Sequence, residues 1–155
     1  MKTNTYIIIL IMIIFFVISF ITNIIGPLIP EIIENFNLSL SAAALLPFAF
    51  FIAYGFSSIP SGYLVEIYGE KKIILTALSI AFIGSLIFSI FSNYLTGIIS
   101  LFLIGVGMSI LQVAINPLLR NCSGPENFAF YSVLGQLFFG FASFLSPKIY
   151  ILTSK

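Results

Sequence analysis

The sequence predicts an all-α membrane protein with about five transmembrane helices and no soluble globular core. Of its 155 residues, 60% are hydrophobic and 7% are charged, whereas an average soluble domain is about 45–50% apolar and about 25% charged. The charges are also clustered, because residues 3–30, 35–65, 73–119 and 127–147 contain none. A lipid bilayer is therefore the solvent that suits this chain.

Each uncharged stretch is long enough for a membrane-spanning helix, which needs about 20 apolar residues. The stretch 73–119 has room for two such helices, which are divided by the more polar segment 91–97. The five predicted spans lie near residues 6–26, 42–64, 73–91, 97–117 and 128–147.

The first span could instead be a cleaved signal peptide, since Lys2 precedes an apolar run from Tyr6 to Ile21. That run is at the long limit for a signal peptide, and the segment 25–27 that follows is a poor cleavage site. A retained first helix is the favoured interpretation.

Prolines are expected to shape three of the helices. A proline removes one main-chain hydrogen bond and clashes with the preceding turn, so it often ends or kinks a helix. Pro27 and Pro30 are predicted to close the first helix, and Pro117 to end the fourth. Pro47 and Pro60 are predicted to interrupt the second.

The basic residues indicate how the chain is oriented in the membrane. Lys2 precedes the first helix, the second connector carries Lys71 and Lys72, and the fourth carries Arg120. By the positive-inside rule these segments face the cytoplasm. The sequence thus predicts an integral protein of the cell (inner) membrane with a cytoplasmic N-terminus, although two lysines near the C-terminus are a mild exception.

Polar and small residues within the spans follow helical stripes. Residues three, four and seven positions apart share one face of a helix. Such stripes occur in the first, second, fourth and fifth spans: Ser19, Thr22, Asn23 and Gly26; Ala49, Ala53, Ser57 and Ser61; Gly105, Ser109, Gln112 and Asn116; and Ser132, Gln136, Phe139 and Ser143.

Two interpretations of these stripes compete. Small residues let helices pack closely and amides bond between helices, which is the favoured interpretation for the second span. The alternative is a polar cavity lined by the first, fourth and fifth spans, where carboxamides both donate and accept hydrogen bonds and are costly to leave alone in hydrocarbon. Such a cavity would suit a neutral polyhydroxylated ligand. Its four carboxamides would be Asn23, Gln112, Asn116 and Gln136.

Composition argues against several other functions. The chain has no His, Asp or Trp and no acid inside a span, which argues against an intramembrane enzyme. Its single cysteine, Cys122, excludes a disulfide within the chain. The lack of His and Asp also removes most metal-ligand chemistry. No cofactor motif is present, because Gly105 and Gly107 lie within a membrane helix and follow no strand. A net charge of +1 without a basic run argues against a nucleic-acid partner.

The connector 62–72 resembles the loop signature of the major facilitator superfamily. That signature is a glycine, an acid four residues later, a glycine three residues further on, and then a basic pair. The residues that fill it are Gly62, Glu66, Gly69, Lys71 and Lys72. Glu66 replaces the usual Asp, and Ile67 stands where a basic residue is expected. Gly62 is expected to permit close helix packing, and Glu66 to accept hydrogen bonds from a facing helix N-terminus. The alternative is a generic charged turn.

Other segments are similar to fucose-permease-like sugar symporters, the fucose–galactose–glucose:proton symporter family. The similar segments are residues 54–62, 111–117, 124–126 and 135–139, so the likeness covers nearly the whole chain. It implies a transporter of twelve helices in two halves that moves a sugar by alternating access. Helices one and four would border the central cavity, and helices two and five would face the other half.

Departures from this family concern proton coupling. Gly26 and Gln112 stand where proton-coupled fucose permeases carry acidic residues. A glycine or an amide does not titrate, so neither position can carry a proton. The five glutamates are expected to lie in connectors, which predicts no intramembrane proton relay of the usual kind. Phe139 stands where the family has an Asn; it either stacks on a sugar ring or packs against a neighbouring helix, and packing is favoured.

The length of the chain is a further departure. Twelve helices of about 20 residues each, with connectors, need roughly 400 residues. The resemblance therefore predicts that residues 1–155 are an incomplete N-terminal six-helix half, with the sixth helix and the C-terminal half absent and no transport by the chain alone. Its partner would be that missing half or another subunit. The alternatives are a partner-dependent small membrane subunit or a membrane scaffold without transport activity.

Overall fold

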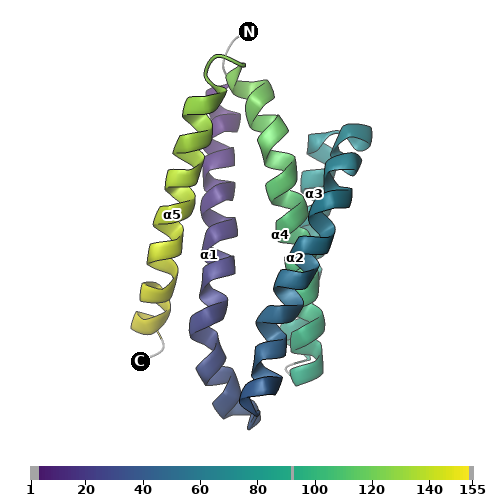
Figure 1. Cartoon of the computed structure of the whole chain (residues 1–155), viewed down its shortest axis with the longest axis vertical. Coiled ribbons are helices and arrows are strands. Elements are labelled where there is room, and N and C mark those ends of the chain that lie inside the picture. Colours follow the sequence, from purple (N-terminus) through teal and green to yellow (C-terminus); the bar gives the residue numbers. More distant parts are fainter. Residues whose placement is uncertain (1–3, 92, 154–155) are drawn as a thin grey trace. The chain divides into compact units, whose positions relative to one another are not determined.

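The computed structural model describes residues 4–91 and 93–153, and in this part of the chain it contains five long helices and no strand (Figure 1). All five are long and apolar enough to cross a membrane, so the predicted number of spans is confirmed. The connections between them are short. The helices are α1 (Thr5–Phe36), α2 (Leu40–Tyr68), α3 (Glu70–Ile90), α4 (Tyr94–Ser123) and α5 (Phe128–Thr153).

These helices divide into two compact units. The first contains Met1–Leu28 and Ile115–Lys155, and the second contains Ile29–Ala114. The first unit therefore holds most of α1, the end of α4 and all of α5. The second holds α2, α3 and the greater part of α4.

In the first unit, α1 and α5 run side by side (Figure 1) and are joined by two serines. The hydroxyl of Ser19 on α1 donates to the main-chain oxygen of Phe139 on α5, at 2.6 Å. The hydroxyl of Ser146 on α5 donates to the main-chain oxygen of Phe20 on α1, at 2.8 Å. Both serines are completely buried. Each helix thus donates one buried hydrogen bond to the backbone of the other.

In the second unit, α4 packs against both α2 and α3 through glycines. A Cβ atom at Gly105 would overlap the main-chain oxygen of Phe50 on α2, and one at Gly107 would lie 2.7 Å from the main-chain oxygen of Ala77 on α3. Main-chain approach this close leaves no room for a side chain. The hydroxyl of Tyr94 also donates to the main-chain oxygen of Ala42 at 2.8 Å.

The prediction that prolines end the first and fourth helices is wrong. Helix α1 continues through Pro27 and Pro30 to Phe36, and α4 continues through Pro117 to Ser123. Helix α2 likewise contains both of its prolines without interruption. In hydrocarbon every remaining peptide group still needs a partner within its own segment, so a proline removes one bond without ending the helix.

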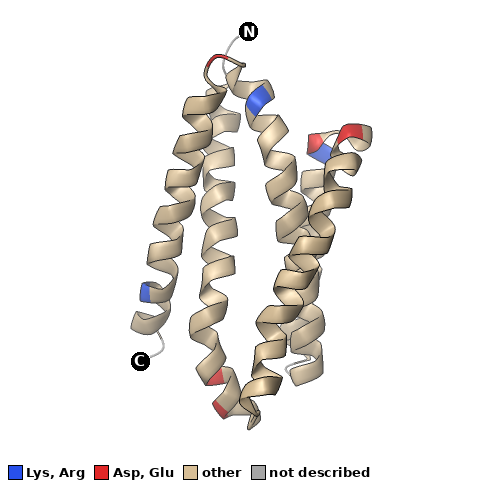
Figure 2. Ribbon diagram, in the orientation of Figure 1, with Lys and Arg blue, Asp and Glu red and all other residues tan. Residues whose placement is uncertain are grey.

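The prediction that the acids lie in connectors is also wrong for most of them. Glu31 and Glu34 belong to the last turns of α1, Glu66 belongs to the last turn of α2, and Glu70 begins α3. Glu126 lies in the connector between α4 and α5. Charged residues nevertheless gather towards helix ends (Figure 2), which leaves the middle of each helix apolar, as a bilayer requires.

Candidate functional site

Ser19 brings two of the predicted site residues together in the first unit. The side-chain amide nitrogen of Asn23 lies 2.8 Å from the main-chain oxygen of Ser19 and 3.3 Å from its hydroxyl oxygen. That same hydroxyl donates to the main-chain oxygen of Phe139. The carboxamide of Asn23 is half-buried, as is Phe139. Asn23 and Phe139 are therefore connected through one buried serine.

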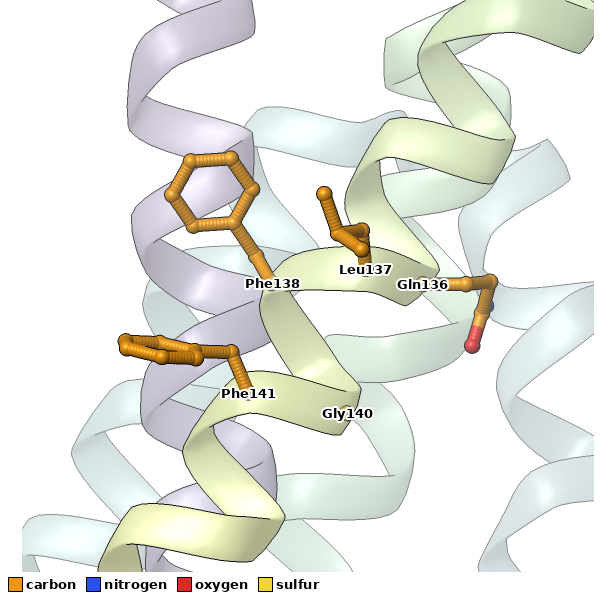
Figure 3. A pocket seen from close by; sticks show the side chains of 5 residues that line it. All are labelled: Gln136, Leu137, Phe138, Gly140 and Phe141. Atoms are coloured by element: carbon orange, nitrogen blue, oxygen red, sulfur yellow. The ribbon is translucent and has the colours of Figure 1, made fainter.

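Gln136 lies on the other side of α5 from two phenylalanines. It lines a hollow on the surface of α5 together with Leu137, Phe138, Gly140 and Phe141 (Figure 3). Figure 3 shows the carboxamide of Gln136 directed away from the rings of Phe138 and Phe141. The lining of the hollow is almost wholly apolar, so the carboxamide of Gln136 contributes to another side of α5 than the one that faces the hollow.

Two of the predicted carboxamides lie on exposed surface. Asn116 on α4 and Gln136 on α5 are both exposed. A polar group moved from water to an apolar medium without a hydrogen-bond partner costs about 2–7 kcal/mol. The exposed carboxamide of Gln136 therefore favours contact with protein or water over contact with acyl chains. Together with Asn23 and Phe139, Asn116 and Gln136 place four of the five predicted site residues in the first unit.

Gln112, the fifth predicted residue, belongs to the second unit and contacts α2. The phenolic hydroxyl of Tyr54 donates to its side-chain oxygen. One turn earlier on α4, the hydroxyl of Ser109 donates to the main-chain oxygen of Tyr54 at 2.7 Å. With Gly105 against Phe50, three members of the polar stripe on α4 pack against α2. For these three residues, packing between helices is the interpretation that the structure supports.

Sequence reasoning missed Tyr54 as a partner of the site. It follows Ala53 of the small-residue stripe on α2, and Ala49, Ala53 and Ser61 of that stripe are buried. A tyrosine inside an apolar span usually needs a partner for its hydroxyl. That requirement was a usable indication, although it did not identify Gln112.

The connector motif of the second unit contains two glycines in different situations. Gly69 has φ +79° and ψ 154°, and its N–H donates to the main-chain oxygen of Val65 at 2.9 Å, which closes the end of α2. Gly62 lies within α2, and a Cβ atom there would meet nothing within 4 Å. The close packing expected at Gly62 is therefore not observed in the described part of the chain.

The charged residues of this motif are accessible. Glu66, Lys71 and Lys72 are all exposed. Among residues 4–91 and 93–153, no helix N-terminus donates to Glu66, contrary to expectation. Within the same described ranges, no three His, Cys, Asp or Glu side chains gather where a metal ion could bind.

Long apolar helices joined by hydrogen bonds from buried serines and half-buried tyrosines, with charges at their ends, define an integral membrane protein of the polytopic α-helical class. The chain belongs to the major facilitator superfamily: the sequence profile of that family matches residues 11–152. This confirms the family suggested by the connector motif.

Curated relatives are similar over most of this chain. Glucose/galactose transporters of Brucella abortus biovar 1 (strain 9-941) and Brucella abortus (strain 2308) are each 34% identical over 136 residues, which is 86% of this chain and 33% of the relative. The L-fucose-proton symporter of Escherichia coli (strain K12) is 29% identical over 136 residues, or 85% of this chain and 31% of the relative. The chain thus spans about a third of the length of these relatives. No solved structure matches it.

Proposed function

We propose that the chain is the N-terminal part of a sugar transporter that works by alternating access. The observation that carries this proposal is the membership of residues 11–152 in the major facilitator superfamily, combined with relatives named for glucose, galactose and L-fucose transport. Transporters of this kind bind their substrate between two repeats, and these repeats rock against each other around the site.

The substrate that we propose is a small neutral sugar. The middle of each helix carries no charge, and the polar groups available there are mainly carboxamides and hydroxyls, which match the hydroxyl groups of a sugar. The proposed binding residues are Asn23, Gln112, Asn116, Gln136 and Phe139. The apolar face of a sugar ring could lie against Phe139, although its main chain already serves the packing of α1 against α5.

The remaining part of the binding site would come from another half. A site built between two halves has one wall when only one half is present, and this chain spans about a third of its relatives. We therefore propose that residues 1–155 alone transport nothing and act with a C-terminal half or a partner subunit. A partner-dependent membrane subunit or a scaffold without transport activity is the alternative.

The proposed location is the inner membrane of the cell, and in the proposed orientation the N-terminus lies in the cytoplasm. It is supported by Lys71 and Lys72, which lie at the start of α3 and are exposed, and by Arg120 in the last turn of α4. Reporter fusions that are active on one side of the membrane test it: a reporter after Lys72 is expected to report the cytoplasm, and one after Asn37 the opposite side.

Sugar uptake tests the transport function. The protein, expressed from its complete coding sequence in cells that lack glucose, galactose and L-fucose uptake, is expected to take up at least one of these labelled sugars. Excess unlabelled sugar should compete, and a sugar acid should not. Asn23→Ala and Gln136→Ala are expected to lower uptake at unchanged membrane abundance. Ser58→Ala is the control and should leave uptake unchanged, because the hydroxyl of Ser58 bonds only the main chain of its own helix in the described part of the chain. A scaffold would leave uptake at background in every strain.

A further inference from the structure

A relay of three hydrogen-bonding groups connects the backbone of α5 to the side chain of Asn23. Its first member is the main-chain oxygen of Phe139, its second the buried hydroxyl of Ser19, and its third the carboxamide of Asn23. All three belong to the first unit of the chain. The direction in which each hydrogen points can be derived from the chemistry of these groups.

The first step fixes the hydroxyl of Ser19. A main-chain oxygen can only accept a hydrogen bond, so at 2.6 Å the hydroxyl must donate its single hydrogen to Phe139. The hydroxyl oxygen of Ser19 is then left with its lone pairs and can only accept. Its complete burial excludes competition from solvent.

The second step fixes the carboxamide of Asn23. One end of that carboxamide is directed towards Ser19, one turn earlier on the same helix. Its terminal atom lies 2.8 Å from the main-chain oxygen of Ser19 and 3.3 Å from the hydroxyl oxygen, and both of these oxygens accept. Only an NH₂ group can satisfy two acceptors. The NH₂ end is therefore directed to Ser19, and the carbonyl oxygen Oδ1 is directed away from it.

The outward oxygen of Asn23 is available for a ligand. Among the residues that the structure describes, Asn23 forms hydrogen bonds only through its nitrogen, and only within α1. We propose that Ser19 is a positioning residue whose main-chain oxygen and hydroxyl together make Asn23 an obligate acceptor, so that this position recognises a sugar hydroxyl that donates its hydrogen. The proposal rests on the proposed transport function and specifies the hydrogen-bond polarity of the same site.

A series of sugar analogues tests this polarity in the unmodified protein, expressed from its complete coding sequence. Each ring hydroxyl of a transported sugar is replaced in turn by hydrogen or by fluorine, and competition with uptake of the labelled parent sugar is measured. Fluorine accepts weakly and cannot donate. At the ring position whose hydroxyl donates to Asn23, both analogues are expected to bind about 3- to 10-fold more weakly than the parent sugar, because one hydrogen bond is lost.

Asn23→Ala identifies that ring position, because there the variant should no longer discriminate between the parent sugar and its deoxy analogue. A fluorinated analogue that binds as well as the parent at that position would overturn the proposal, since it would require a donor at Asn23.

Ser146 provides a matched control for Ser19. Both serines are completely buried, and both donate to a main-chain oxygen of the facing helix. In the part of the chain that the structure describes, however, no carboxamide bonds the hydroxyl of Ser146. Ser19→Ala keeps the 2.8 Å bond to the main-chain oxygen of residue 19 and loses the 3.3 Å bond to the hydroxyl. It is therefore expected to raise the KM for sugar about 2- to 3-fold with unchanged kcat, and Ser146→Ala to leave the KM unchanged. Equal KM changes in the two variants would mean that Ser19 acts only in helix packing, and would overturn its positioning role.

A measurement independent of transport separates this inference from the proposed function. In protein labelled with ¹⁵N-asparagine, the side-chain NH₂ of Asn23, assigned by its loss in Asn23→Ala, is expected to exchange slowly with deuterated solvent. Exchange should accelerate in Ser19→Ala and stay slow in Ser146→Ala. Fast exchange in the unmodified protein would overturn the relay whether or not sugar is transported. Slow exchange without any sugar uptake would instead contradict the proposed function and leave the relay intact.

Discussion

Tyr54 on α2 donates its phenolic hydrogen to the side-chain oxygen of Gln112 on α4. This bond gives Gln112 a role between helices in addition to its proposed role in sugar binding. It also satisfies a tyrosine hydroxyl that would be costly to leave alone in an apolar environment. Together with the bond from Ser109 to the main chain of Tyr54, it makes Tyr54 a polar link between α2 and α4, beside the bond from Tyr94 to Ala42.

Removal of the Tyr54 hydroxyl is expected to weaken this link. Hydrogen bonds between membrane helices are worth about 0.6 kcal/mol on average and at most about 1.7 kcal/mol, so Tyr54→Phe should lower the free energy of unfolding by that amount. Titration with SDS, followed by circular dichroism, measures it. Tyr63→Phe is the control, because Tyr63 lies on the same helix and is 67% exposed. Equal effects of the two substitutions would show that the Tyr54–Gln112 bond contributes nothing.

Gly105→Ala should disrupt the contact between α2 and α4. The new methyl group would overlap the main-chain oxygen of Phe50, and a main-chain atom can yield only if the two helices separate. Overpacking of this kind costs about 1–3 kcal/mol, which SDS titration would detect. Gly55→Ala on α2 is the matched control, since nothing lies within 4 Å of its added Cβ atom. Full stability of Gly105→Ala would argue against the close approach of α2 and α4.

The connector motif offers a third test, on backbone conformation. Gly69 has φ +79° and ψ 154°, a combination that costs a residue with a side chain about 1–3 kcal/mol. Gly69→Ala is therefore expected to destabilise the α2–α3 junction, as measured by faster amide exchange of residues 65–73. Gly62→Ala, which adds a methyl group to open space within α2, should leave that exchange unchanged. If both variants behave alike, the positive φ of Gly69 is not required.

A fourth prediction concerns the five glutamates. They lie at helix ends or in a connector, away from the middle of the spans where a proton relay would operate. Replacing each by Gln should therefore leave the dependence of sugar uptake on an imposed pH gradient unchanged, even if Glu66→Gln changes the rate. Vesicle uptake with and without the gradient measures this. A variant that lost gradient-driven accumulation but kept exchange of sugar would contradict the prediction. The residues are Glu31, Glu34, Glu66, Glu70 and Glu126.

The number of spans could be predicted because the absence of charge over about 20 residues is a direct physical requirement of the bilayer. Helix ends were predicted less well. Pro27, Pro30 and Pro117 looked like helix ends by the rules for soluble proteins, but a membrane segment continues through them. The tendency of proline to end a helix is outweighed here, because the other peptide groups in hydrocarbon still need hydrogen-bond partners.

The polar stripes were recognised correctly as sets of residues sharing a helix face, but their partners were not. Periodicity places Gly105, Ser109 and Gln112 on one side of α4, and only the packing of α2 against that side shows that they contact Phe50 and Tyr54. Similarly, Ser19 and Asn23 lie one turn apart in any helix, whereas the acceptor on Phe139 comes from α5, 120 residues away in sequence. Such long-range pairs depend on helix placement, which local patterns do not encode.

The most direct test of the proposed sugar transport is counterflow in proteoliposomes. Two purified proteins are compared: residues 1–155 alone, and residues 1–155 joined to the C-terminal two-thirds of a Brucella glucose/galactose transporter, with the intact Brucella protein as reference. The joined protein is expected to exchange labelled glucose, galactose or L-fucose for unlabelled sugar inside the vesicles, and the 155 residues alone to exchange none. Exchange by the chain alone would contradict its dependence on a second half. A joined protein that is folded and inserted yet exchanges no sugar, beside an active reference, would contradict the proposed function itself.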